Sequence, residues 1–323
     1  MIQKPIAIIQ GEPNSVSSEI ILKLWKKRKT FKHKPFFIIG NYRLLDRHKK
    51  FFKINCKLKK INQDFKIRDL NSSSIPILDV KFNQKKIFEK ISKKSNGFIF
   101  ACFEIALRLI KSKKIFGLIN CPISKETLLH GKYKGITEFI SSKLGYKNKE
   151  VMLIFNKEYS VSPITTHIPI KKISKSLSKK KIIYKIKTID SFYKKYLKKK
   201  TNFAVTGLNP HCYNSEKFSE EKNIIKPAIN YLKKKKIKIS GPYSADSLFA
   251  KKNNKFNIVV GMYHDQVLTP IKSLKGFDAI NVTIGLPCIR VSPDHGVASD
   301  ITGKGKANPK SLIESIKFFN LIK

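Results

Sequence analysis

Short apolar runs alternate along the chain with longer segments in which apolar residues recur at helical spacing. Apolar runs of about four to eight residues bounded by Gly, Pro or Asn are typical of buried strands, and their alternation with helical segments is typical of βαβ units. The pattern therefore predicts the α/β class with a largely parallel sheet. Predicted strands cover residues 6–10, 35–40, 115–120, 203–207, 256–262 and 279–285, and predicted helices cover 15–29, 97–113, 182–198, 220–235 and 309–322.

Two further features bear on the organisation of the chain. Asn308 is suited to cap the last helix and Pro309 to occupy its first position, because an amide oxygen satisfies free backbone N–H groups and proline fixes φ in advance. At 323 residues the chain is long enough for two compact lobes. The polar, lysine-rich stretch 171–181 is the most linker-like segment, but it does not set a boundary.

The formal net charge of +45, from 67 Lys and Arg against 22 Asp and Glu, invites a nucleic-acid interpretation. The lysines are spread along the whole chain, however, and many fall where helices would end, so that they complement helix dipoles. No helix-turn-helix, zinc-finger or RNA-recognition signature is present. We therefore expect no nucleic-acid partner, with a non-catalytic basic nucleic-acid-binding protein as the alternative.

The cysteines and the N-terminal sequence indicate the compartment. Five scattered cysteines without a C-x-x-C pair favour a reducing environment over a disulfide framework. The N-terminal stretch lacks a signal-type apolar core, and no apolar run reaches the length of a membrane span. We therefore expect a cytoplasmic protein without a membrane partner.

Three histidines lie at informative places. His167, His211 and His264 each follow an apolar run that reads as a strand. In an open α/β sheet, ligands bind at the carboxyl ends of the strands, so side chains far apart in sequence can meet there. Imidazole suits zinc and other divalent metals, and three ligands leave positions open for substrate. A shared metal site is one interpretation of this placement, and three unrelated histidines are the other, because the spacing itself carries no signature.

Other polar residues fall in the same segments. Asp246 lies in a loop-like stretch, and Lys272, Asn281 and Arg290 come from the segments that follow His264. Arg290 is one of few arginines in a lysine-rich chain, and its planar fork recognises phosphate or carboxylate in a way that lysine does not reproduce. We expect it to bind an anion.

A glycine-punctuated loop precedes the last predicted helix. The dinucleotide fingerprint G-x-G-x-x-G is missing from the first strand-helix turn, where the sequence runs Gly11-Glu12-Pro13. Residues 294–309, with Gly296, Gly303 and Gly305, form a loop that could cradle a nucleotide or serve as a plain turn.

Several motifs together resemble one family. They are Gly11-Glu12-Pro13, the stretches 120–126, 137–139 and 165–169, Gly-Leu-Asn-Pro-His at 207–211, Met-Tyr-His-Asp-Gln at 262–266, Asn-Val-Thr-Ile-Gly-Leu-Pro at 281–287 and the loop before the last helix. In this combination, which covers essentially the whole chain, the sequence resembles the 4-hydroxythreonine-4-phosphate dehydrogenases, the PdxA family of the vitamin B6 pathway.

The resemblance implies a two-domain α/β/α architecture similar to isocitrate and isopropylmalate dehydrogenases. It places one lobe at residues 1–130 with 285–323 and a second at 131–284, with the active site in the cleft between them. It further implies a homodimer with shared active sites, and a divalent ion (Zn, Mg, Co or Mn) on the three histidines.

The resemblance also assigns individual roles. The positions that match substrate-binding residues are Thr137, Lys272, Asn281 and Arg290, and those that match catalytic residues are Asp246 and Lys272, either of which could move the proton. The C-terminal loop assigns NAD or NADP to His295, Gly296 and Asn308.

The implied reaction is oxidation of the 3-hydroxyl of 4-phosphooxy-L-threonine followed by loss of CO2, which gives 3-amino-2-oxopropyl phosphate. One departure bears on the substrate: Ile136 stands where the family has a histidine. A related phosphorylated four-carbon hydroxy acid is therefore an alternative substrate.

Overall fold

The computed structural model describes residues 4–71, 73–129, 133, 135–213, 219–250, 255–294 and 296–322. The chain divides into two compact units. Residues Met1–Glu150 and Leu286–Leu321 form unit 1, and residues Val151–Gly285 with Ile322–Lys323 form unit 2. Unit 1 therefore takes its last strand and last helix from the far end of the chain. Residues 135–150, which the sequence-based division assigned to the second lobe, belong to unit 1.

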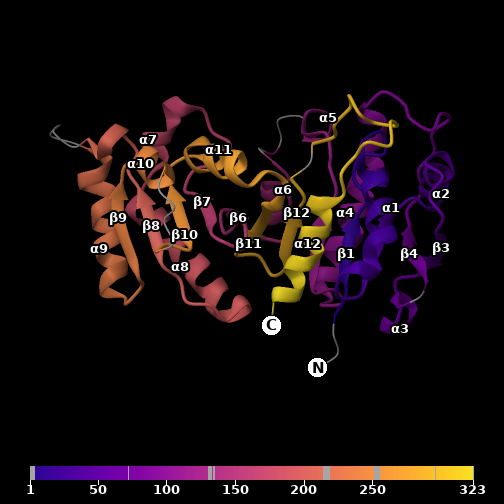
Figure 1. Ribbon diagram of the computed structural model, residues 1–323, viewed down its shortest axis with the longest axis horizontal. Helices are drawn as coiled ribbons and strands as arrows, with labels where there is room; N and C mark the ends of the chain where they lie inside the picture. The colour runs from indigo at the N-terminus through magenta and orange to yellow at the C-terminus, as the bar shows by residue number, and fades with distance from the viewer. Residues whose placement is uncertain are drawn as a thin grey trace. The chain divides into compact units, whose positions relative to one another are not determined.

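Unit 1 contains a sheet in which every described pairing is parallel (Figure 1). Its strand order is β3-β4-β2-β1-β5-β12. The strands are β1 (Ile6–Ile9), β2 (Phe36–Gly40), β3 (Lys57–Ile61), β4 (Ser74–Asp79), β5 (Gly117–Asn120) and β12 (Ile289–Ser292). The α-helices are α1 (Ser17–Lys27), α2 (Tyr42–Phe51), α3 (Ile67–Leu70), α4 (Asn96–Lys111), α5 (Lys125–Leu129), α6 (Ile136–Lys143) and α12 (Lys310–Leu321), and two 3-10 turns are η1 (Arg28–Thr30) and η2 (Lys93–Ser95).

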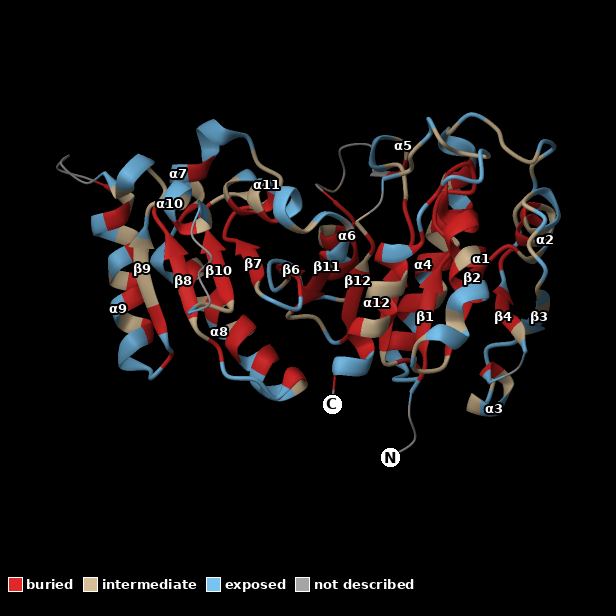
Figure 2. Ribbon diagram, in the orientation of Figure 1, coloured by how far each residue is buried: buried red, intermediate tan, exposed pale blue. Residues whose placement is uncertain are grey.

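Both faces of the central strands of unit 1 are covered. Ala7 and Ile9 on β1 join an apolar cluster with α4 and α6, whereas Ile6 and Ile8, which point to the opposite face, are also fully buried. A Cβ at Gly117 would lie 2.2 Å from Phe319 of α12, so this helix packs directly on β5. Strands buried on both faces are continuously apolar, which is why the sequence pattern located them. Figure 2 shows the resulting arrangement of buried strands and helices with exposed outer faces.

Unit 2 has a mixed sheet with strand order β11-β6-β7-β10-β8-β9. The pairings of β6 with β11 and with β7 are antiparallel, and β7, β10, β8 and β9 run parallel. The strands are β6 (Val151–Phe155), β7 (Ser160–Pro163), β8 (Phe203–Thr206), β9 (Ile239–Tyr243), β10 (Ile258–Gly261) and β11 (Ile280–Ile284). The helices are η3 (Ile170–Lys172), α7 (Ile173–Ser176), α8 (Lys179–Phe192), η4 (Tyr193–Leu197), η5 (Pro210–Cys212), η6 (Glu221–Ile225), α9 (Lys226–Lys234), α10 (Ala245–Ala250), α11 (His264–Lys275) and η7 (Gly276–Asp278).

The predicted α/β class is confirmed, and each of the six predicted strands contains an observed one, from β1 to β11. The five predicted helices correspond to α1, α4, α8 with η4, η6 with α9, and α12. Asn308 caps the last helix as predicted, since its Oδ1 accepts from Lys310 N–H at 3.0 Å. In the described part of the chain, no helix has the length and apolar character needed to cross a bilayer.

Candidate active site

Three histidine-bearing loops leave the same edge of the sheet in unit 2. His167 follows β7, His264 follows β10 and His211 follows β8. In the sheet β10 lies between β7 and β8, and all three strands are parallel (Figure 1). The carboxyl ends of three adjacent parallel strands therefore carry the three histidines, which is the placement that the sequence pattern predicted.

Backbone and side-chain hydrogen bonds tie these loops together. The carbonyl oxygen of Met262 accepts from Thr165 Oγ1 at 2.8 Å and from Thr165 N–H at 3.1 Å, which joins the loop of His167 to that of His264. Gln266 joins the third loop: its Oε1 accepts from Met262 N–H at 2.7 Å and from Thr206 Oγ1 at 2.8 Å, and its Nε2 donates to the Gly207 carbonyl at 2.8 Å. The amide of Gln266 thus fixes the strand ends relative to one another.

Two of the imidazoles are neighbours. The ring centroids of His167 and His264 lie 5.7 Å apart, with their planes inclined by 42°. Nδ1 of His264 lies 2.6 Å from Oδ1 of Asp265, so this carboxylate orients the ring and favours a proton on Nδ1. Both histidines are partly exposed. A pair of imidazoles open to solvent is chemically suited to ligate a metal or to move protons.

His211 occupies a strained turn that a buried carboxylate holds in place. Its φ is 53° and that of Cys212 is 56°, in the left-handed region that L residues seldom adopt. Glu221, which is fully buried, accepts from Leu208 N–H and Asn209 N–H, both at 2.8 Å, immediately before the turn. Unfavourable backbone conformations persist only where the surroundings impose them, and they concentrate at functional sites.

The absence of a side chain at Gly207 leaves room for the Glu221 carboxylate beside the turn that contains His211. A Cβ there would lie 2.8 Å from Cys212 Sγ and 3.0 Å from Glu221 Oε1, so a larger residue would push the carboxylate away from the loop. Glu221 and Gln266 were not singled out from the sequence as site residues. The adjacent pair Glu220 and Glu221 at the start of a predicted helix is a signal in a chain so poor in acidic residues.

The remaining candidates in unit 2 are less closely grouped. Asp246 lies in the first turn of α10, and hydrogen bonds from Ser244 and Ser247, together with the charge of His211, hold the pKa of its carboxyl below the usual range. Lys272 lies on α11 about two turns beyond His264. Asn281 lies on β11, and its buried Oδ1 has no hydrogen-bond partner among the described residues. Asp246 is thus the candidate that lies near one of the histidines.

The residues at the carboxyl ends of these strands meet only some of the requirements of a metal site. The donor chemistry is suitable, because imidazole nitrogen binds first-row divalent ions. Yet within the described residues no group of three His, Cys, Asp or Glu side chains is arranged to hold a metal ion. The sheet brings the three histidines to one edge, and two of them into ring contact, without forming a three-ligand centre in a single chain.

Unit 1 buries Arg290, the arginine that the sequence marked for anion binding. It lies on β12 and is only 4% exposed. Its Nε donates to Oδ1 of Asn120 at 2.7 Å and its Nη1 to Oγ1 of Thr137 at 3.2 Å. Burial lowers the pKa of the guanidinium to about 10, although the charge of Glu138 acts in the opposite direction. Arg290 therefore remains a cation at neutral pH, and it contacts Thr137, another predicted substrate-binding residue.

Two further loops complete this end of the sheet in unit 1. Gly11 has φ +81°, and a Cβ there would lie 2.4 Å from the Pro122 carbonyl oxygen. The next residue, Glu12, donates its N–H to that same oxygen at 2.8 Å. The Glu12 carboxylate is fully buried and accepts from Ser95 Oγ at 2.7 Å, and burial raises its pKa. The motif around Gly11 thus joins the ends of β1 and β5, beside Asn120.

Ile136, the position at which the resemblance led us to expect a histidine, belongs to the core of unit 1. It is the first residue of α6 and lies in the same apolar cluster as Phe139 and Ile140. The substitution therefore exchanges a polar contact for packing directly beside Thr137.

The loop expected to bind the cofactor is anchored to α1. Glu19 accepts from Ala307 N–H at 2.8 Å, and Lys23 donates to the carbonyls of Gly305 and Ala307 at 2.7 and 2.8 Å. Gly296 is exposed, Asn308 serves as the helix cap, and His295 lies outside the described residues.

The fold defines a structural class: a two-unit α/β architecture of the type seen in β-decarboxylating dehydrogenases. The chain resembles the structure of a β-decarboxylating dehydrogenase from Thermococcus kodakarensis, with a TM-score of 0.51 at 10% identity over 98% of this chain and 83% of that one, which is a likeness of fold alone. The model of the pyridoxal phosphate biosynthetic protein PdxA matches residues 32–319. The chain belongs to this family.

Individual relatives match over nearly their full lengths. A 4-hydroxythreonine-4-phosphate dehydrogenase from a Sulfurihydrogenibium species is 35% identical over 322 residues, covering 98% of both chains. A protein from Oceanobacillus iheyensis named as a candidate D-threonate 4-phosphate dehydrogenase is 30% identical, covering 98% of this chain and 97% of its own. The crystal structure of a 4-hydroxythreonine-4-phosphate dehydrogenase from Klebsiella pneumoniae has a TM-score of 0.83 at 28% identity, with 98% of each chain covered.

Proposed function

We propose that this protein oxidises the 3-hydroxyl of 4-phosphooxy-L-threonine with NAD or NADP and then releases CO2, forming 3-amino-2-oxopropyl phosphate for vitamin B6 synthesis. Membership of the PdxA family and the names of its relatives support this reaction. The observation that carries it is the set of three histidine-bearing loops at adjacent strand ends, tied together by Gln266.

The reaction sets clear demands on the residues. A hydride leaves C3 for the nicotinamide ring while the hydroxyl loses its proton, and after CO2 departs a proton must return to the carbon. Asp246 is an exposed carboxylate whose pKa is lowered in part by the charge of His211. It is suited to accept the first proton. Lys272, an ammonium on α11, is suited to supply the second.

Four polar residues would bind the anionic substrate. Arg290 and Thr137 would hold its phosphate or carboxylate, since a planar guanidinium pairs with either group in bidentate fashion. Asn281 offers a buried amide oxygen to an N–H or O–H of the substrate, and Lys272 adds positive charge. The cofactor would lie against the loop that contains His295, Gly296 and Asn308.

His167, His211 and His264 would hold a divalent ion, whose chemistry as a Lewis acid is to acidify the alcohol and to withdraw electrons as CO2 leaves. A partner subunit of a homodimer would complete this site, as membership of the family implies. The free cysteines in the described residues support a reducing compartment, in keeping with a cytoplasmic enzyme.

A second candidate substrate is a phosphorylated four-carbon hydroxy acid such as D-threonate 4-phosphate. Two observations favour it: the similarity to the Oceanobacillus iheyensis protein, and the apolar Ile136 beside Thr137. An amino acid and a hydroxy acid differ in the charge at C2, so the two substrates need different polar contacts there.

A turnover assay decides between these functions. Purified protein is given each substrate with NAD and with NADP, and NADH or NADPH is followed by absorbance while the product is identified by mass. We expect oxidation coupled to CO2 release with 4-phosphooxy-L-threonine. Turnover of D-threonate 4-phosphate alone would establish the alternative, and turnover of neither by folded, metal-loaded protein would overturn both.

The metal is tested separately from turnover. His211→Ala should lower the affinity for Zn²⁺ or Co²⁺ in calorimetry by more than the roughly 10–100-fold that loss of an outer-shell partner costs, with unchanged circular dichroism. His33→Ala is the matched control, because His33 lies in unit 1 between α1 and β2. Full turnover after exhaustive chelation would contradict the role of the metal.

A further inference from the structure

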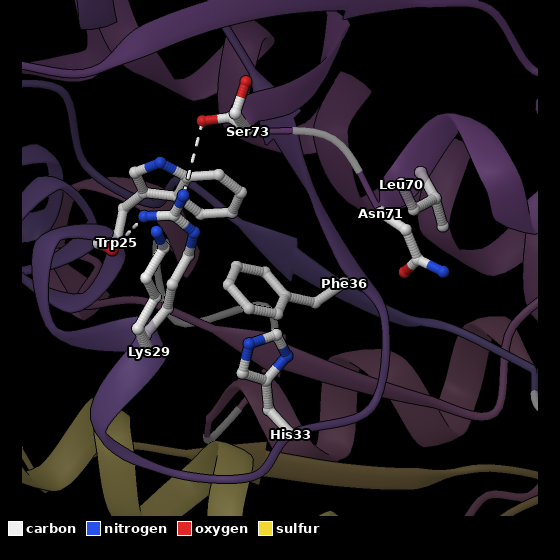
Figure 3. Close-up of a pocket in the computed structure, with 8 residues that line it drawn as sticks. Trp25, Lys29, His33, Phe36, Leu70, Asn71 and Ser73 are labelled. Carbon is white, nitrogen blue, oxygen red and sulfur yellow. Dashed lines mark hydrogen bonds between the residues drawn. The ribbon is translucent and has the colours of Figure 1, made fainter.

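Unit 1 contains a pocket that the proposed reaction does not use. Its volume is about 340 Å³, and it is lined by Trp25, Arg28, Lys29, His33, Phe36, Leu70, Asn71 and Ser73. These residues come from the end of α1, from η1, from the start of β2 and from the segment between α3 and β4. Figure 3 shows the rings of Trp25 and Phe36 on one side of the pocket and Leu70 and Asn71 on the other.

The pocket lies at the opposite edge of the sheet from the candidate active site of unit 1. Phe36 is the first residue of β2, and Ser73 directly precedes β4. Both strands are parallel to β5, whose last residue is Asn120. The pocket therefore lies at the amino ends of the strands, whereas Asn120 and Arg290 mark the site near the carboxyl ends. A ligand here would take no part in the oxidation.

Aromatic rings form the wall of the pocket. Trp25 is 4% exposed and meets Phe36 edge to face, with ring centroids 5.6 Å apart. His33 also meets Phe36 edge to face at 5.2 Å. These contacts fix the ring planes without a ligand, so a planar molecule would find a preformed surface.

The same wall carries fixed positive charge. The Arg28 guanidinium lies 4.0 Å above the Trp25 ring, and its Nη1 and Nη2 donate to the carbonyls of Trp25 at 3.0 Å and of Ser73 at 3.4 Å. Arg28 is thus held across the pocket as a planar cation. Lys29 adds a second charge, and the described lining residues include neither Asp nor Glu.

We propose that this pocket binds a small anion with a single planar ring that bears a phosphate or carboxylate group. The ring would stack on the Arg28 guanidinium, which covers the nearly buried Trp25 ring, and would pack beside His33. The anionic group would pair with Arg28 and Lys29. The volume lies at the low end of the roughly 300–1,000 Å³ of ligand sites, which suits one ring and excludes a dinucleotide. The inference is independent of the proposed reaction.

The test uses the fluorescence of Trp25, the single tryptophan of the chain. Full-length protein at about 0.15 M salt, which screens diffuse charge, is titrated with phenyl phosphate and with benzoate. Inorganic phosphate and benzyl alcohol serve as ligands that have only one of the two features. We expect saturable quenching and a raised melting temperature with an aromatic anion, and neither with the two partial ligands at the same concentration.

Variants locate the site. Arg28→Gln should weaken binding at least about tenfold, equivalent to about 1.4 kcal/mol, whereas Arg43→Gln, the same change at an exposed position on α2, should leave it unchanged. Lys29→Gln, also at an exposed position, is the second variant should Arg28→Gln fail to fold. Three results would overturn the proposal: no saturable change, equal weakening by Arg43→Gln, or displacement of phenyl phosphate by an equal concentration of inorganic phosphate.

Discussion

The carboxylate of Glu221 accepts hydrogen bonds from both the backbone and the side chain of Asn209, at 2.8 and 3.1 Å. Two residues further on, the chain enters the left-handed turn that contains His211. A single buried acidic residue thus constrains the loop on which a predicted metal ligand lies, and its replacement has measurable consequences.

Glu221→Ala should lower the free energy of unfolding by about 2–3 kcal/mol, because hydrogen bonds to a charged group are lost and two partly buried N–H groups lose their acceptor. Exchange of the Leu208 and Asn209 amide hydrogens should accelerate, and metal affinity should fall. Glu220→Gln is the control, since Glu220 is only partly buried and should cost under about 1 kcal/mol. Unchanged amide exchange in Glu221→Ala would refute the anchoring role.

His48 makes stability depend on pH. Its ring is fully buried and stacked on Phe88, its Nε2 donates to the Ile87 carbonyl, and Nδ1 has no partner among the described residues. Burial lowers the pKa of His48 from its usual 6.5 to about 4. The unfolded chain binds the proton more readily than the folded one does. The stability that comes from burying a neutral His48 is therefore fully present above about pH 6.5 and is lost as the pH falls towards 4.

His48→Phe should flatten that dependence. The shift corresponds to roughly 3 kcal/mol, so the difference in unfolding free energy between pH 7 and pH 4.5 should shrink by up to that amount. The Ile87 carbonyl keeps a second donor, Gln84 Nε2, at 2.7 Å, so the variant leaves it satisfied. Urea unfolding at both pH values measures the effect, and an identical pH dependence in the variant would exclude His48 as its source.

Arg290 and Thr137 should act together on the substrate. Arg290→Lys keeps the charge but loses the planar fork, so KM should rise at least about tenfold, equivalent to about 1.4 kcal/mol. Thr137→Val removes the hydroxyl that accepts from Arg290 and should also raise KM, whereas Thr137→Ser retains the hydroxyl and should rescue it. Steady-state kinetics with the accepted substrate distinguishes these cases, and a normal KM in Arg290→Lys would exclude anion recognition by the fork.

Substitutions of Ile136 test how much its apolar side chain contributes to the stability of unit 1. Ile136→His, which restores the family's residue, should destabilise unit 1 by about 1–3 kcal/mol, because a polar ring would enter an apolar cluster. Ile136→Val should cost about 0.5–1.5 kcal/mol from lost volume alone. Thermal and urea unfolding give both values. If the histidine variant is as stable as the wild type, the cluster accommodates a polar group at this position.

The sequence pattern located the elements whose signal is local. Strands such as β1 and β8, buried on both faces, appear as continuous apolar runs. By contrast, β3 (Lys57–Ile61) contains three lysines and has no buried residue, so it did not stand out. The antiparallel contact of β6 with β11 depends on residues far apart in the sequence, and no local pattern specifies it.

The candidate site likewise contains some residues that the sequence located and others that it did not. The position of His167, His211 and His264 after strands was visible in the sequence, because strand ends are local features. The residues that hold the loops, Glu221 and Gln266, act through contacts between segments. The contact of Arg290 with Asn120 follows from the pairing of β12 with β5, and its contact with Thr137 from the position of α6. Only the folded chain shows either.

The discontinuity of unit 1 has a consequence for biosynthesis. Because β12 and α12 come from the last forty or so residues of the chain, a nascent chain leaving the ribosome lacks β12, the strand that carries Arg290, until translation is nearly complete. Unit 2 is almost entirely contiguous and can fold while the rest is still being synthesised. A chain cut short after Gly285 would therefore retain the histidine loops but lack the buried arginine that we propose binds the substrate.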